Sequence, residues 1–202
     1  LTEKGFIDEG LWQNKVNRED DWGTLRAAHI CLELSGIIKK RYNKYSITQK
    51  GKKIVKNRNS LYKKFNESLF AKFNWAYTDG YPQELANWGA GYLIFLFHEY
   101  GKEPQTLDFY VEKYIKLNPR VLEYFDDSEY SSSRERLKQC LQIRFFRRIF
   151  RKSGLLTFDK KKEGFFGIID NIKTTPLFDA TFTFHFDEKR KAHKPMHDIG
   201  SP

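Results

Sequence analysis

The chain has 202 residues, with 36 lysines and arginines against 26 aspartates and glutamates and a formal net charge of +10. This length can bury a hydrophobic core in one large domain or two small ones, and a composition of 40% hydrophobic residues excludes a wholly disordered chain. Its two cysteines exclude a disulfide framework and a multi-cysteine zinc site, and no apolar stretch reaches the ~20 residues of a membrane-spanning helix.

The positive charge is concentrated in two segments. Residues 34–66 contain eleven basic and no acidic side chains, and residues 134–163 contain eleven basic and three acidic ones. Residues 67–133, between them, contain eleven acidic and only five basic side chains. Charge concentrated in this way attracts polyanions such as nucleic acids at long range. The alternative is a pair of solvated, lysine-rich faces without a partner.

The first basic segment and its surroundings predict a helix, a hairpin and a second helix. Apolar residues recur every three or four positions over residues 22–34, and Gly36 suits the left-handed position that ends a helix. Short extended runs on both sides of the basic residues 39–44 predict a hairpin. Thr48 is placed to cap a helix over residues 49–56.

This order, with Ser-Gly-Ile-Ile at 35–38 and Ile-Thr-Gln-Lys-Gly at 47–51, resembles the winged-helix DNA-binding families, including the MarR-like regulators. The resemblance implies that residues 22–34 are equivalent to the recognition helix and that residues 39–44 form the tip of the wing. The basic side chains of the wing and of the following helix are then expected to contact phosphates. They are Lys39, Lys40, Arg41, Lys44, Lys50, Lys52 and Lys53.

The expected recognition helix is poor in groups that read base edges. Its candidate outward positions include one permanent cation, whereas major-groove readers usually offer several Arg, Asn or Gln side chains. These positions are Thr24, Arg26, Ala27, His29, Ile30 and Glu33. We therefore expect non-specific or shape-led binding through phosphates or the minor groove.

A similar order of elements is predicted over residues 133–187. A helix over residues 137–153 ends in Ser-Gly followed by two leucines, which parallels residues 25–38. A hairpin is expected around the charged residues 159–164, and alternation of apolar and polar residues over 180–186 predicts a further strand. We interpret this segment as a second winged-helix-like unit.

Four arginines of the second helix recur at intervals of three and four residues, which predicts one stripe opposite an apolar face. The stripe is Arg144, Arg147, Arg148 and Arg151, and the hairpin tip adds Lys160, Lys161 and Lys162. Planar guanidinium groups suit contacts with phosphates. The alternative is that these arginines pair with the acidic middle of the chain, including residues 126–129.

Residues 61–132 predict a helical core between the two units. Residues 61–73 are amphipathic, and residues 85–100 are apolar nearly all round, as in a buried helix. The order of motifs from Leu1 to about Tyr130, above all Phe-Asn-Trp-Ala-Tyr-Thr-Asp-Gly-Tyr-Pro at 73–82, resembles an uncharacterised family of bacterial proteins. That resemblance implies a bacterial origin but no particular activity.

No catalytic motif is found in the sequence. It lacks a glycine-rich phosphate loop, a serine-hydrolase elbow and an HExxH zinc motif. His193 and His197 have helical metal-site spacing, but Pro195 between them indicates a flexible tail. Asp79, with Glu84 nearby, is the least poor catalytic candidate. We expect neither a metal nor a cofactor, and no enzyme activity.

The sequence therefore predicts a mostly helical α+β protein in four segments: a winged-helix-like unit at 1–60, a helical core at 61–132, a second winged-helix-like unit at 133–187 and a flexible tail at 188–202. The only methionine is Met196, so we expect the chain to continue upstream of Leu1. The absence of a signal-peptide pattern predicts a cytoplasmic protein, without a membrane partner.

The predicted function is non-enzymatic DNA binding, for example in transcription regulation. The alternative is a protein-interaction or dimerisation module that docks an acidic partner or a second copy on the same basic faces. A third interpretation is an enzyme whose catalytic part lies upstream.

Overall fold

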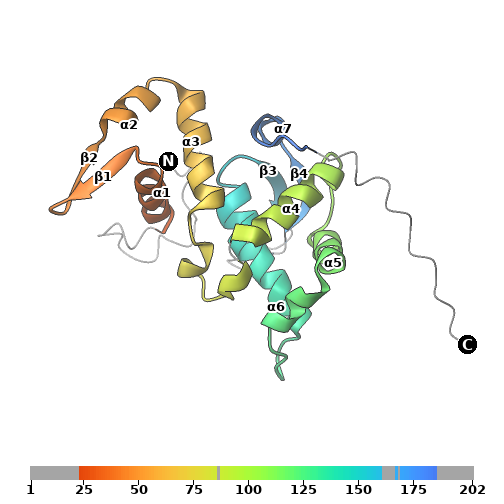
Figure 1. Ribbon diagram of the computed structural model, residues 1–202. Coiled ribbons are helices and arrows are strands. Elements are labelled where there is room, and N and C mark those ends of the chain that lie inside the picture. Colours follow the sequence, from red (N-terminus) through yellow and green to blue (C-terminus); the bar gives the residue numbers. More distant parts are fainter. Residues whose placement is uncertain (1–22, 86, 161–166, 168, 186–202) are drawn as a thin grey trace, which may run out of the picture.

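The computed structural model describes residues 23–85, 87–160, 167 and 169–185 (Figure 1). The protein is mostly helical, with two small antiparallel sheets of two strands each, which confirms the predicted α+β class. Within the described ranges, no helix has both the length and the apolar character needed to cross a membrane. The predicted tail at 188–202, with its two histidines, lies outside the described residues.

The first described segment is a helix, a hairpin and a short helix, as predicted. Its elements are α1 (Gly23–Leu34), β1 (Ile38–Arg41), β2 (Lys44–Ile47) and α2 (Gln49–Ile54). α1 ends because Gly36 takes a φ of 71°, which lets the Ile37 N–H donate to the Leu32 carbonyl at 3.0 Å. The Thr48 hydroxyl donates to the Gly36 carbonyl at 2.7 Å and accepts the Gly51 N–H at 2.8 Å, so it closes the hairpin and caps α2.

The central helices include both of those predicted for the middle of the chain, over residues 61–73 and 85–100. They are α3 (Arg58–Ala71), α4 (Asn87–Tyr100), α5 (Leu107–Leu117) and α6 (Ser133–Cys140), with 3-10 turns at Trp75–Thr78, Gln83–Leu85 and Pro119–Tyr124. α6 continues directly into a π-helix, η6 (Leu141–Phe150). In Figure 1, α3 lies between the first hairpin on one side and α4, α5 and α6 on the other.

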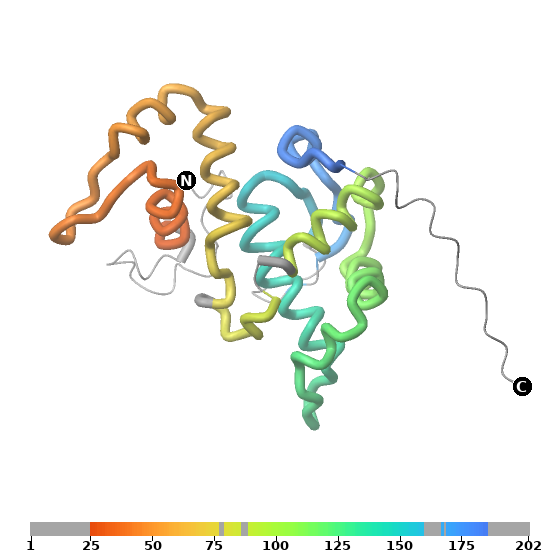
Figure 2. The backbone as a smooth tube through the Cα atoms, in the orientation of Figure 1, coloured from red at the N-terminus to blue at the C-terminus, as the bar shows by residue number. Residues whose placement is uncertain are grey.

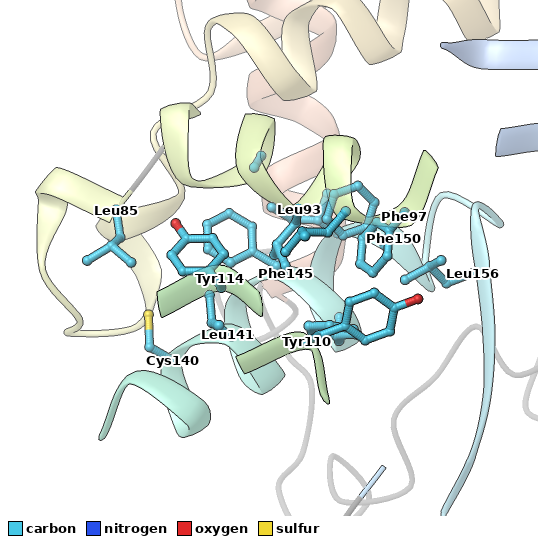
Figure 3. Packing of buried hydrophobic residues seen from close by; sticks show 14 of the residues in the cluster. Leu85, Leu93, Phe97, Tyr110, Tyr114, Cys140, Leu141, Phe145, Phe150 and Leu156 are labelled. Carbon is cyan, nitrogen blue, oxygen red and sulfur yellow. The ribbon is translucent and has the colours of Figure 1, made fainter. Parts of the chain in front are cut away.

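The core is centred on Phe97 of α4, which is completely buried. Its ring lies 4.9–6.1 Å, centroid to centroid, from four aromatic rings of α5, η6 and the C-terminal part of the chain, all edge-on. They are Tyr110, Phe146, Phe150 and Phe178. Figure 3 shows Phe97 beside Phe150 within this cluster. Buried side chains form one cluster across the position of the predicted boundary at residue 133.

The C-terminal part of the fold repeats the first motif. After η6 come β3 (Leu156–Lys160), β4 (Ile169–Thr174) and α7 (Pro176–Thr181). Gly154 has a φ of 74°, and the Leu155 N–H donates to the Phe150 carbonyl at 2.9 Å. The Thr175 hydroxyl donates to the Gly154 carbonyl at 2.7 Å, the same bond that Thr48 makes in the first motif. The parallel predicted from Ser-Gly therefore extends through the hairpin to the threonine before the next helix.

The two hairpins differ in burial. In β4, Ile169 and Ile172 are buried in the core, and Ile172 exchanges backbone hydrogen bonds with Gln105, just before α5. In β1 and β2, every residue is exposed except the half-buried Ile38. The tip of the first hairpin projects away from α3, α4, α5 and α6, as the chain trace in Figure 2 shows. One copy of the motif is thus part of the core, and the other extends into solvent.

The prediction of a strand over residues 180–186 is wrong for residues 180–185, which the structure describes. Pro176 begins α7, which runs to Thr181, and no strand is found from 182 to 185. The alternation arises because Phe182 packs against Phe70 at 5.4 Å and Phe184 stacks on His98 at 3.9 Å. An extended segment can insert alternate side chains into the core without a neighbouring strand.

Substituting Gly51 with alanine should destabilise the first motif. A Cβ atom at this position would lie 2.1 Å from the Ile37 carbonyl oxygen and 2.9 Å from Ile47 Cγ1. We expect Gly51→Ala to lower the free energy of unfolding by about 1–3 kcal/mol, measured by urea denaturation. The matched control is Gly91→Ala in α4, where a Cβ meets nothing within 4 Å and alanine should add about 0.5–1 kcal/mol. Equal effects of the two substitutions would contradict the close approach at Gly51.

Candidate nucleic-acid interface

The first hairpin separates its side chains onto two faces. Its register pairs Lys39 with Ser46, Lys40 with Tyr45, and Arg41 with Lys44. Paired residues share a face and faces alternate along each strand, so Lys39, Arg41 and Lys44 lie together. These three residues are called the cationic face below.

The cationic face is exposed and holds like charges close together. All three side chains are exposed. Arg41 lies directly opposite Lys44, an arrangement that destabilises an antiparallel pair because the charges repel. In residues 23–85, 87–160, 167 and 169–185, no carboxylate lies within ion-pair distance of these three cations. The repulsion is therefore not relieved within the described structure.

The opposite face of the hairpin holds it to α1. The Lys40 ammonium lies 5.1 Å from the centre of the Tyr45 ring, and that ring lies 4.7 Å from the imidazole of His29. Lys40 therefore packs over an aromatic ring as well as adding charge. This contact fixes the direction in which the cationic face points.

α2 extends the positive surface beyond the hairpin. Lys50, Lys52 and Lys53 are exposed. Lys52 and Lys53 are in the last turn, where the helix dipole stabilises cations. This gives them a structural role in addition to the predicted phosphate contacts.

The predicted outward face of α1 is wrong in part. Ala27 and Ile30 pack against the hydrophobic core. Every residue from 25 to 33 is half-buried or buried, so none of them is exposed. The reason is that α1 is held between α3 and the hairpin, which contacts His29. α1 therefore presents no open row of side chains of the kind that reads a major groove.

Arg144 is not part of a surface stripe, contrary to the sequence prediction. Its side chain has no exposure, and its Nε and Nη2 donate to the two carboxylate oxygens of Asp79 at 2.7 and 2.5 Å. Nη1 and Nη2 also donate to the carbonyls of Pro82 and Tyr81 at 2.9 and 3.0 Å. The alternative, that the arginines pair with the acidic middle, is confirmed for Arg144.

This pairing also buries Asp79, the least poor catalytic candidate of the sequence. Its side chain is 1% exposed, and one of its oxygens accepts the Tyr81 N–H at 3.0 Å in addition to Arg144. Burial opposes the charge on the guanidinium, but the hydrogen bonds to Asp79 and its negative charge outweigh this and raise the pKa of Arg144. The pair is a structural cross-link between a turn and η6.

The other predicted cations of the second unit are in mixed surroundings. Arg147 donates to the Gly167 carbonyl, and Arg148 lies 3.9 Å from Asp79. Arg151 is exposed and lies over the Phe158 ring at 4.9 Å. Lys160 is the last residue of β3, and Lys161 and Lys162 lie outside the described residues. Phosphate contacts from this unit stay a prediction.

Two basic residues at the start of the second basic segment, 134–163, form ion pairs with carboxylates of α5. Arg134 lies 2.5 Å from Glu112, and Lys138 lies 2.7 Å from Asp108. The two cations are four residues apart on α6, and their two carboxylate partners are four residues apart on α5. Part of the positive charge of residues 134–163 is therefore balanced inside the fold.

One exposed residue of the hairpin was missed by the sequence analysis. Tyr42, at the tip, is 99% exposed and follows Arg41 directly. The signal that could have found it is an aromatic residue between cations in a predicted turn.

Comparison of the chain with protein-family models, with curated proteins and with solved structures gave no match. The resemblances to winged-helix proteins and to a bacterial family stay predictions. Across the residues that the structure describes, no group of three or more His, Cys, Asp or Glu side chains could hold a metal ion.

Removing the Arg144 charge should destabilise the whole fold. We expect Arg144→Met to cost about 3–5 kcal/mol in urea unfolding, because it leaves a buried carboxylate without its partner. The control is Arg151→Met, directly after the end of η6, where the exposed guanidinium should contribute less than about 1 kcal/mol. Comparable losses from both variants would contradict the structural role of Arg144.

Both cysteines should resist thiol reagents in the native protein. Cys31 and Cys140 are completely buried, and burial raises the pKa of each thiol to about 12. At neutral pH the reactive thiolate is therefore almost absent. We expect no labelling by a disulfide reagent in buffer and two equivalents in denaturant. Rapid labelling of the native protein would show that α1, which holds Cys31, or α6, which holds Cys140, opens.

Proposed function

We propose that this protein binds DNA non-covalently and that the cationic face of the first hairpin contacts the phosphates. The observation that carries the proposal is the exposed pairing of Arg41 opposite Lys44, with Lys39 on the same face. A phosphate between two such cations converts a repulsive arrangement into an attractive one. The proposal includes a winged-helix role for the hairpin, in which it is the wing.

The charge around this face favours a polyanion over a single anionic group. Residues 34–66 contain eleven basic and no acidic side chains, and the exposed lysines of α2 follow the hairpin directly. Cations spread along a projecting hairpin and a helix match repeated phosphates along a backbone. α1 offers no open reading face, so we propose binding with little base specificity. Transcription regulation in a bacterial cytoplasm belongs to the same proposal.

Neutralising the cationic face should weaken DNA binding for every sequence. The variant is Lys39→Gln with Arg41→Gln and Lys44→Gln, measured by fluorescence anisotropy with a labelled random duplex at about 50 and 200 mM salt. We expect affinity to fall at least about tenfold at low salt, and the slope of log K against log salt to flatten by about three, since about one counterion is released per phosphate contact.

The matched control changes net charge by the same amount elsewhere. Lys102→Gln, Lys116→Gln and Arg120→Gln remove three exposed cations from around α5, at the opposite end of the molecule in Figure 1. We expect this variant to keep the wild-type slope. If both variants lose affinity equally, net charge and not the hairpin is responsible. If neither binds less than the wild type, or if the wild type does not bind, the proposal is wrong and an acidic protein partner becomes the better interpretation.

A further inference from the structure

Tyr42 is an exposed aromatic side chain at the tip of the first hairpin. It is 99% exposed, and no other ring or cation of the described ranges contacts it. By contrast, Tyr45 in the same hairpin contacts both Lys40 and His29. Removal of the Tyr42 ring would therefore leave the packing of the protein unchanged.

The backbone at the tip is unfavourable for a tyrosine. Tyr42 and Asn43 have φ values of 49° and 58°, so both central residues of this two-residue turn are left-handed. Such turns favour Asn-Gly or Asp-Gly, because a bulky side chain in the left-handed region is strained. Strain at an exposed position, where no contact with the described residues offsets it, points to a role outside the folding of the chain.

The surroundings of the ring specify what it would meet. Arg41 and Lys44 flank it on the two strands and are the residues proposed to contact phosphates. Cations that follow a backbone, combined with an aromatic ring, are how proteins bind nucleic acid with unpaired bases, since every base has a face for stacking. A single exposed ring among polar neighbours lacks the apolar area that holds a protein in a membrane surface.

We propose that Tyr42 stacks on an unpaired or unstacked base, so that the hairpin binds DNA containing such a base more tightly than an uninterrupted duplex. This inference rests on the proposed DNA binding of the cationic face. The phosphates next to the base are held by Arg41 and Lys44, and the left-handed turn directs the ring outward between them.

The test compares two labelled duplexes of one sequence, one intact and one with a single unpaired 2-aminopurine, whose fluorescence is quenched by stacking and therefore changes with its stacking partner. We expect the wild type to bind the second duplex about 5- to 150-fold more tightly, the range of one stacked base, and to change its fluorescence. Tyr42→Asn, which suits the left-handed turn, should abolish both effects and leave binding to the intact duplex unchanged. Tyr42→Phe should retain both effects.

The controls separate this inference from the proposed function. Tyr130→Asn removes a tyrosine that is 91% exposed and follows the acidic residues Asp126, Asp127 and Glu129, and it should change nothing. Wild-type binding that depends on the cationic face but is equal for both duplexes, or a preference that survives Tyr42→Asn, would overturn the stacking role alone. Absence of any DNA binding would overturn both proposals. Tyr42-dependent binding to phosphatidylserine vesicles without a base preference would assign the tip to an anionic lipid surface instead.

Discussion

The arrangement of the helices depends on one buried ion pair, between Arg144 and Asp79. The turn at 79–82 leads from α3 towards α4, and Arg144 binds both the carboxylate and two carbonyls of this turn from η6. The pair thereby sets where α4 begins relative to η6, and this in turn places Phe97 against the aromatic residues of η6. A buried pair is tolerated only when its hydrogen bonds are made, and four donor contacts of the guanidinium are satisfied here.

The two basic segments of the chain have similar charge and different uses. In residues 134–163, Arg134, Lys138 and Arg144 have carboxylate partners on α5 or in the 79–82 turn. In residues 34–66, Lys64 is paired with Glu67, whereas the cationic face has no carboxylate partner in the part of the chain that the structure describes. Net charge therefore does not distinguish an internal network from a binding surface. The two are distinguished by whether the fold brings carboxylates close to the cations.

The sequence predicts those structural features that depend on residues close together along the chain. Gly36 and Thr48 determine the end of α1 and the start of α2 through bonds within the motif, so both were predictable. The burial of Arg144 depends on a carboxylate 65 residues away. The positive charge led to the opposite interpretation, and the alternation over 180–186 likewise lacked information about a partner strand.

The repeated motif explains how an unfavourable hairpin tip can persist. A two-stranded hairpin is marginal by itself. The first one is held at its base by the Thr48 bond to Gly36, by the close packing of Gly51 on Ile37, and by the contact of Tyr45 with His29. The second hairpin has the equivalent threonine bond and uses its buried isoleucines to join the core. Because the same base bond recurs under both hairpins, the side chains beyond it are free to differ. In the first hairpin they include two opposed cations and a left-handed tyrosine, which the base holds in solvent where a ligand can reach them.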